Sequence, residues 1–201
     1  MPSSGSKAAK IISVTNQKGG VGKTTTTINL AAALSQLKKK VLIIDLDPQG
    51  NASTGLGVEI EDRELSTYEF LVEGAPLEKV AMETEISGLS IVPATIDLSS
   101  ADIDLISNEK RSHLLHEALR KKQENKKKYD FILIDCPPSL NILTVNAMVA
   151  SHSVLIPLQS EFFALEGLSQ LLLTVKEVRQ TANENLRVCL LYTSPSPRDC
   201  Q

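Results

Sequence analysis

Short apolar runs alternate with stretches of helical periodicity along most of this chain. The runs expected to form strands are Ile11–Thr15, Val41–Asp45, Leu89–Val92, Phe131–Asp135, Ser153–Pro157 and Leu186–Leu191. The stretches expected to form helices are Thr24–Leu37, Ser66–Leu71, Glu109–Lys122, Leu140–Ala150 and Phe162–Gln180. The strand runs are rich in Ile, Val and Leu with little polar alternation, which is typical of strands covered on both faces. The alternation predicts an α/β fold with a doubly wound, mostly parallel sheet flanked by helices.

The last of these helices is expected to be amphipathic. Its apolar positions recur at helical spacing, at Leu165, Leu168, Leu172 and Val175, and Ser160 is placed to cap the helix start. These positions form one apolar stripe along the predicted helix.

The two ends of the chain depart from the alternating pattern. Residues 1–9 are mostly small and polar and are expected to be a disordered lead-in. The final stretch, CLLYTSPSPRDCQ, begins as a strand and then turns to Pro195 and Pro197, with no helix following to cover the sheet. We therefore expect one domain over residues 10–188 that is incomplete at its C-terminus after about Val188, and a non-native tail over residues 189–201.

Composition restricts the function classes. The chain has 201 residues, 42% of them hydrophobic and 22% charged, as expected for one globular domain. A net charge of −3 gives no general indication of nucleic-acid binding and leaves only local basic patches for it. The three cysteines are too few and too far apart for a disulfide framework or a CxxC metal site. Because no secretory signal and no membrane-spanning apolar run is found, we expect a cytoplasmic protein without a membrane partner.

The segment NQKGGVGKTTTT, residues 16–27, lies where the first predicted strand meets the first predicted helix. Its glycines would let backbone N–H groups converge on phosphate oxygens beside the positive end of the helix dipole. This is the context of a P-loop, in which Lys23 reaches the β- and γ-phosphates and the Thr24 hydroxyl ligates Mg²⁺. The predicted nucleotide contacts are Lys18, Gly19, Gly20, Val21, Gly22, Lys23, Thr24 and Thr25. The alternative is a glycine turn that happens to precede a lysine.

The loop departs from the ordinary P-loop at its start, because Gln17 stands where that motif has glycine and Lys18 follows it. The string KGGVGKTT resembles the deviant Walker A motif of the group that contains ParA, MinD and the nitrogenase iron protein. In that group the first lysine reaches phosphates bound by the other subunit of a dimer. The resemblance implies that Lys23 holds the nucleotide within its own subunit, while Lys18 neutralises charge in the partner's site much as an arginine finger does. A solvated loop lysine is the alternative for Lys18.

Three carboxylates lie at the ends of predicted strands. Asp45 and Asp47 close the second strand, and residues two apart in an extended segment share a face. Asp47 is our candidate for orienting the attacking water, while Asp45 is expected to support the Mg²⁺ shell or the P-loop; either could instead cap a turn. Asp135 ends the strand FILID in the Walker B position, where a carboxylate holds Mg²⁺ through water. The predicted catalytic residues are Lys18, Lys23 and Asp47, and the predicted metal-site residues are Thr24, Asp45 and Asp135.

Over about residues 10–188 the chain resembles the ParA-type partition ATPases of the Soj group. The stretches that carry the resemblance are NQKGGVGKTTT, DLDPQGNASTGLG, DCPPSLNILTVNA and IPLQSEFFALEGLSQLL. The resemblance implies an ATP- and Mg²⁺-dependent ATPase of the deviant Walker A type that acts in chromosome or plasmid partitioning at the nucleoid. It further implies an ATP-dependent homodimer that binds DNA without sequence preference and is stimulated by a ParB-type centromere-binding protein.

Other functions fit the sequence less well. A MinD-type membrane-cycling ATPase of cell-division site placement shares the loop, but DPQGN is not its pattern after the second strand. Nitrogenase iron proteins need cluster cysteines that this chain lacks, and Lys18 argues against a small-molecule kinase. The cluster RKKQENKKK, residues 120–128, is the local candidate for nucleic-acid contact, although a solvated loop is the stronger expectation there.

Overall fold

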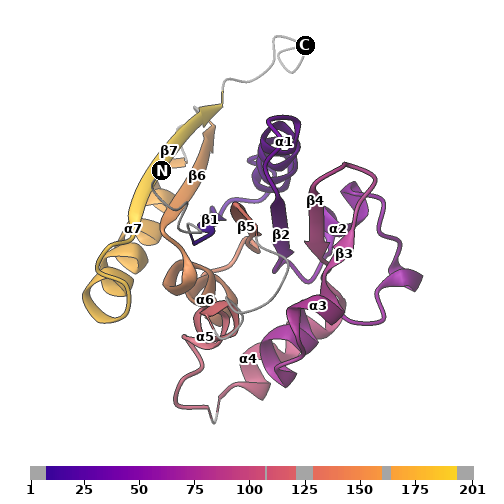
Figure 1. The fold of residues 1–201 in the computed structure, drawn as a ribbon. Coiled ribbons are helices and arrows are strands. Elements are labelled where there is room, and N and C mark those ends of the chain that lie inside the picture. Colours follow the sequence, from indigo (N-terminus) through magenta and orange to yellow (C-terminus); the bar gives the residue numbers. More distant parts are fainter. Residues whose placement is uncertain (1–7, 107, 121–128, 160–163, 194–201) are drawn as a thin grey trace, which may run out of the picture.

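In the part of the chain that the structure describes, seven strands form one sheet at the centre (Figure 1). The computed structural model describes residues 8–106, 108–120, 129–159 and 164–193. The strands are β1 (Lys10–Val14), β2 (Val41–Asp45), β3 (Met82–Glu83), β4 (Leu89–Val92), β5 (Phe131–Asp135), β6 (Ser153–Gln159) and β7 (Arg187–Thr193). Their order is β3-β4-β2-β5-β1-β6-β7, and every neighbouring pair is parallel except β3 with β4. The doubly wound, mostly parallel sheet predicted from the apolar runs is confirmed.

Helices cover both faces of this sheet. The α-helices are α1 (Lys23–Gln36), α2 (Asn51–Gly55), α3 (Leu77–Val80), α4 (Ala101–Asp104), α5 (Leu114–Arg120), α6 (Ile142–Ala150) and α7 (Ala164–Thr181). Shorter turns are η1 (Ile60–Asp62), η2 (Glu69–Glu73) and η3 (Ile96–Ser100). Figure 1 shows α1 on one side of the central strands, with α5 and α6 on the other. Within the described segments, no helix combines the length and apolar character needed to cross a membrane.

Strand β2 shows why the strand runs lack polar alternation. All five of its residues are fully buried or nearly so. Val41 and Ile43 pack in the same cluster as Ala31 of α1, whereas Leu42 and Ile44 belong to the cluster on the α5 and α6 side. Because successive side chains point to opposite faces, both faces of β2 need apolar side chains to pack against the two helical layers, and its one polar residue, Asp45, stands at the carboxyl end.

The packing face of α7 differs from the predicted stripe. Leu171, Val175 and Val178 are the deeply buried positions, and they pack against β6. Leu172, a member of the predicted apolar stripe, is 40% exposed. The helix has two overlapping rows of leucine, and the row that includes Leu171 faces the sheet. Ser160, its predicted cap, lies outside the described residues.

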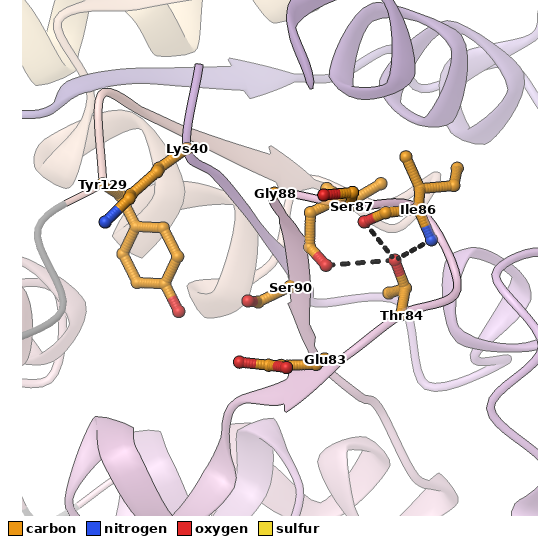
Figure 2. A pocket seen from close by; sticks show the side chains of 9 residues that line it. Lys40, Glu83, Thr84, Ile86, Ser87, Gly88, Ser90 and Tyr129 are labelled. Carbon is orange, nitrogen blue, oxygen red and sulfur yellow. Dashed lines mark hydrogen bonds between the residues drawn. The ribbon is translucent and has the colours of Figure 1, made fainter. Parts of the chain in front are cut away.

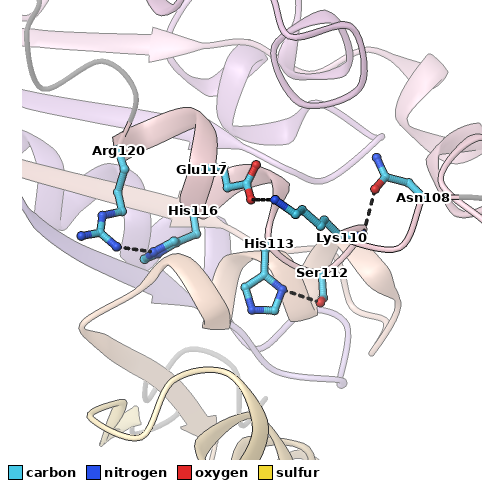
Figure 3. A network of polar contacts seen from close by, with 7 residues as sticks. All are labelled: Asn108, Lys110, Ser112, His113, His116, Glu117 and Arg120. Atoms are coloured by element: carbon cyan, nitrogen blue, oxygen red, sulfur yellow. Dashed lines mark hydrogen bonds and ion pairs between the residues drawn. The ribbon is translucent and has the colours of Figure 1, made fainter.

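The helix predicted over residues 109–122 begins later than expected, and its predicted last two residues lie outside the described part of the chain. Its α-helical part is α5, and the residues before it form turns. The Asn108 Oδ1 atom accepts a hydrogen bond from the Lys110 backbone N–H at 2.9 Å, which turns the chain ahead of the helix (Figure 3). An exposed ion pair between Lys110 and Glu117, 3.2 Å long, spans the junction. Most of the basic cluster, residues 121–128, lies outside the described part of the chain, so its role stays a prediction.

Strand β7 extends beyond the predicted strand end at Leu191. It pairs in parallel with β6 along its whole length, from Arg187 to Thr193. Leu190 is 41% exposed and Leu191 is 38% exposed, although the two side chains point to opposite faces. The first five residues of the segment predicted to be a non-native tail thus belong to the sheet; residues 194–201 and residues 1–7 lie outside the described residues. The domain limits of 10–188 stay a prediction.

Candidate functional site

The segment between β1 and α1 forms a turn whose backbone requires glycine. Gly20 has φ 75° and Gly22 has φ 84°, in the left-handed region that other residues adopt at a cost. A Cβ atom placed on Gly19, Gly20 or Gly22 would meet no other atom of the protein within 4 Å. The three glycines therefore border open space. A ligand can approach the backbone there, as a P-loop requires.

Helix α1 begins directly at the end of this turn. Its first turn contains no acidic residue, and its N-cap, Gly22, offers no side chain to the free N–H groups. The positive end of the helix dipole is therefore not neutralised by the local sequence. Val21 is buried and anchors the loop, whereas Thr25 is exposed in the first turn of α1. This arrangement favours an anion at the helix start.

Lys23 is buried in the loop rather than extended into solvent. Its residue surface is only 7% exposed, and its Nζ atom donates a hydrogen bond to the Lys18 carbonyl oxygen at 3.1 Å. Burial lowers the pKa of Lys23, an effect that the charges of Asp135 and Asp47 oppose. The ammonium group thus lies between the loop and two carboxylates. Lys18 itself is half-buried.

Asp135 joins β5 to the first turns of α1. The Thr24 hydroxyl donates to Asp135 Oδ2 at 2.7 Å, and the Thr27 hydroxyl donates to Oδ1 at 3.0 Å. Burial raises the pKa of Asp135 to about 6, and the two hydroxyl hydrogen bonds work against that rise. The predicted pair of Thr24 and Asp135 is therefore brought together by the fold. Thr27, one helical turn after Lys23, was not predicted from the sequence.

Asp45 lies beside Asp135 on the neighbouring strand β2. Its Oδ2 atom accepts hydrogen bonds from the Ser53 N–H at 2.9 Å and the Ser53 hydroxyl at 2.7 Å, and its Oδ1 accepts one from the Asp47 N–H at 3.2 Å. Burial, with the charge of Asp135 as a smaller cause, raises the pKa of Asp45 to about 7. In this structure Asp45 braces the turn between β2 and α2. Its predicted metal role stays a prediction.

Asp47 follows the end of β2, so strand alternation does not fix its direction. Its residue surface is 7% exposed, and its Oδ1 atom accepts a hydrogen bond from the Gln49 N–H at 3.0 Å. The charge of Asp47 acts on both Lys23 and Asp135, which places it in the same cluster. The fold therefore brings Asp47, Lys23 and Asp135 close together.

Sequence reasoning missed the residues that hold this cluster in place. The Arg63 guanidinium is buried and donates to the carbonyls of Val58 and Ala94 and to the Thr54 hydroxyl. The Ser53 hydroxyl, which bonds Asp45, also accepts the Ala94 N–H at 3.0 Å. These bonds tie α2 to the end of β4. A buried arginine among backbone carbonyls leaves no spacing signal in a sequence.

A second hollow lies at the opposite end of the sheet. It has a volume of about 270 Å³ and is lined by the starts of β2, β4 and β5, as Figure 2 shows. The P-loop follows the carboxyl end of β1, whereas Lys40, Gly88 and Tyr129 precede their strands. In a parallel sheet these are opposite edges, so the hollow is not part of the site.

Comparison with known proteins identifies the family. Residues 9–188 match a family model described as an AAA domain. The sporulation initiation inhibitor protein Soj of Bacillus subtilis is 50% identical over 179 residues, which are 89% of this chain and 70% of that protein. The chromosome partitioning protein ParA of Caulobacter vibrioides is also 50% identical, over 89% of this chain and 67% of that protein. This chain belongs to the ParA/Soj family.

A solved structure supports the P-loop fold of this ParA/Soj chain. The cobyrinic acid a,c-diamide synthase of Mycobacterium smegmatis, with bound ADP and magnesium, matches it with a TM-score of 0.87 and 37% identity. The match covers 94% of this chain and 76% of that one. The family and fold predicted from the four motif stretches are thus confirmed, whereas the roles of individual site residues stay predictions.

The raised pKa values of Asp45 and Asp135 should make the stability of this ParA/Soj protein depend on pH. The folded state holds protons on Asp45 and Asp135 more tightly than the unfolded chain, whose ordinary value is 3.8. The contribution of these two groups to the free energy of unfolding should therefore be greatest below about pH 4. It should fall as the pH rises toward about 7. We expect a total effect on the order of a few kcal/mol.

Urea unfolding of the nucleotide-free protein at a series of pH values measures this slope. Asp45→Asn should flatten it, because an amide does not titrate. The exposed Asp97 provides the control, since Asp97→Asn should leave the slope as in the wild type. If the stability of the wild type instead rises by a similar amount between pH 5 and 7, the raised pKa values of Asp45 and Asp135 are wrong.

Proposed function

We propose that this ParA/Soj protein is an ATP-hydrolysing switch for chromosome or plasmid partitioning. ATP would drive a homodimer that binds nucleoid DNA without sequence preference in the cytoplasm, and a ParB-type centromere-binding protein would stimulate hydrolysis. The observation that carries the proposal is a P-loop with Lys18 ahead of two exposed glycines, in a chain 50% identical to a chromosome partitioning protein. A P-loop with one lysine would bind nucleotide equally well, so Lys18 needs a further role.

The residues of the loop fit a magnesium nucleotide. Open space borders Gly19, Gly20 and Gly22, where a phosphate can approach the backbone N–H groups. Lys23 supplies a cation that is already held close to the loop by the Lys18 carbonyl. The described residues contain no group of three or more His, Cys, Asp or Glu side chains that could hold a metal ion alone. Thr24 and Asp135 would therefore hold Mg²⁺ together with phosphate oxygens and water, and the ion would neutralise phosphate charge.

Hydrolysis requires a group that orients water toward the γ-phosphate. Asp47 is suited to this role because it lies in the cluster with Lys23 and Asp135 and its backbone is held by Asp45. One of its carboxylate oxygens accepts the Gln49 N–H, which fixes the side chain and leaves lone pairs for water. Asp45 would contribute indirectly, because its hydrogen bonds hold the turn between β2 and α2 that carries Asp47.

Lys18 would act across the interface between two subunits. Gly19 and Gly20, which follow it, are exposed, so this part of the loop is at the surface where a second subunit can meet it. A cation added there would neutralise charge that develops on the transferred phosphoryl group. Its contribution would exist only in the dimer.

Replacing Lys18 with alanine tests this proposal. We expect the variant to bind ATP but to lose ATP-dependent dimerisation, and to hydrolyse ATP at least about 10³-fold more slowly, the range found for a residue supplied in trans. DNA binding should weaken as well, because a dimer presents twice the contact surface. Equilibrium ATP binding, sedimentation and steady-state turnover measure the three properties separately. Lys39→Ala, which removes an exposed lysine after α1, is the control.

Mixing two inactive variants decides whether Lys18 acts in trans. A Lys18→Ala subunit keeps its own nucleotide site, and a Lys23→Ala partner still offers Lys18 to it. One composite site is then intact, and partial hydrolysis should return. If Lys18→Ala alone dimerises with ATP and hydrolyses at the wild-type rate, the proposed role of Lys18 is wrong.

A further inference from the structure

Asn16 is a buried polar residue just before the P-loop that the proposed mechanism does not use. It is 5% exposed, and its Nδ2 atom donates a hydrogen bond of 2.7 Å to the carbonyl oxygen of Pro157 in β6. The two residues are 141 positions apart in the sequence. The side chain therefore connects the start of the loop to the neighbouring strand of the sheet.

The other end of the same amide holds Lys18. Asn16 Oδ1 accepts the Lys18 backbone N–H at 3.0 Å. Only one orientation of the amide allows Nδ2 to donate to a carbonyl and Oδ1 to accept from an N–H, so both bonds specify the same geometry. The Lys18 carbonyl in turn accepts the Lys23 ammonium at 3.1 Å. The backbone of Lys18 is thus held on both sides.

Asn16 is separate from the groups that would bind phosphate. Those groups are the N–H donors around Gly19 to Thr25 and the Lys23 ammonium, and the bonds of Asn16 go elsewhere, to Pro157 and Lys18. Gln17, which lies between Asn16 and Lys18, is directed toward α7, where its Oε1 atom lies 3.6 Å from the position of a Cβ on Gly167. Asn16 and Gln17 therefore contact β6 and α7, so the chain just before Lys18 has contacts outside the phosphate cradle.

We propose that Asn16 is a positioning residue that sets the direction in which Lys18 leaves the loop toward a partner subunit. The inference rests on the proposed function, because it concerns the action of Lys18 in the dimer. A buried amide with both ends bonded fixes the loop more firmly than a solvated side chain does. An error of about 1 Å in the position of a group that stabilises charge can reduce a rate about 10²-fold.

Asn16→Ala separates positioning from nucleotide binding. We expect its ATP affinity to change by less than about threefold, while ATP-dependent turnover falls by about 10- to 100-fold. Asn16→Ser should recover part of the turnover, because a serine hydroxyl can accept the Lys18 N–H in a similar but weaker turn. The serine variant also keeps the test valid if the alanine variant folds poorly.

Asn183→Ala is a matched control. Asn183 also donates its amide to backbone carbonyls, those of Met148, Val149 and Ser151, but it lies after α7 and away from the loop. Its replacement should lower thermal stability and leave turnover per folded molecule unchanged. An equal loss of turnover in Asn183→Ala and Asn16→Ala would make Asn16 a structural residue only, and would overturn the inference.

Mixing Asn16→Ala with Lys23→Ala subunits gives a readout that general damage cannot produce. The Asn16→Ala subunit keeps its nucleotide site, and the Lys23→Ala subunit supplies a Lys18 still held by its own Asn16. Partial turnover should therefore return, as with Lys18→Ala. No recovery, or a loss of ATP affinity that matches the loss of turnover, would overturn the inference. If the wild-type protein itself shows no ATP-dependent dimerisation and no turnover, the proposed function is wrong, and this inference fails with it.

Discussion

Lys23→Ala should abolish nucleotide binding. The ammonium of Lys23 is buried and lies 3.1 Å from the Lys18 carbonyl oxygen. This burial is the main cause of the lowered pKa of Lys23. A buried cation that exchanges a carbonyl for phosphate oxygens gains a charge-assisted contact without having to be ordered on binding. Its loss also leaves Asp135 and Asp47 facing the phosphates without a compensating charge. We expect the affinity for ATP with Mg²⁺ to fall by at least about 100-fold, which is about 3 kcal/mol.

Calorimetric titration of the purified variant with ATP and Mg²⁺ measures this loss. Lys39→Ala again serves as the control, since that exposed lysine follows the far end of α1. Circular dichroism establishes that the variant is folded. An ATP affinity equal to that of the wild type in a folded Lys23→Ala protein would show that the segment from Lys18 to Thr25 is not a phosphate loop.

Asp47→Ala should separate binding from hydrolysis. Asp47 contacts the Gln49 N–H and contributes negative charge beside Lys23, so its removal takes no donor away from the phosphates. If it orients the attacking water, turnover should fall by about 10²- to 10⁴-fold while ATP remains bound. The variant should consequently accumulate as the ATP-bound dimer.

Single-turnover hydrolysis and sedimentation with ATP measure the two halves of this result. Asp62→Ala, which removes an exposed carboxylate in η1, should behave as the wild type. Wild-type turnover in Asp47→Ala would move the water-orienting role to Asp45. Asp45→Ala would then have to reduce the turnover of each folded molecule, in addition to the loss of stability that follows from removing its hydrogen bonds with Ser53.

The strands and the loop were predictable because their signals are local. A strand between two helical layers is mostly apolar on both faces, and β2, β4 and β5 have the predicted bounds. The loop was recognisable because glycines at positive φ and a lysine at a helix start have a fixed spacing. β3 was not predicted, because two residues are too few to form a pattern.

The supporting residues could not be predicted because their partners are distant in the sequence. Asn16 bonds a carbonyl 141 positions away, and Thr27 bonds a carboxylate 108 positions away. Each residue type is common in turns and helices, so neither stands out in the sequence alone. The sequence also did not show that Leu171, rather than Leu172, is the buried leucine of α7, because two rows of leucine fit the helical periodicity equally well.

The position of β7 affects how self-association of this protein should be interpreted. Within the described residues β7 pairs only with β6, so the N–H and C=O groups of its other edge have no strand beside them. After Arg187 the strand contains no charge and no proline, the features that usually prevent two edges from pairing. Two molecules joined edge to edge through β7 would leave both P-loops free and would form whether or not nucleotide is present. If this protein forms oligomers without ATP, pairing through the β7 edge would explain them separately from the dimer proposed for Lys18, and only the increase in dimer that ATP causes would report on that dimer.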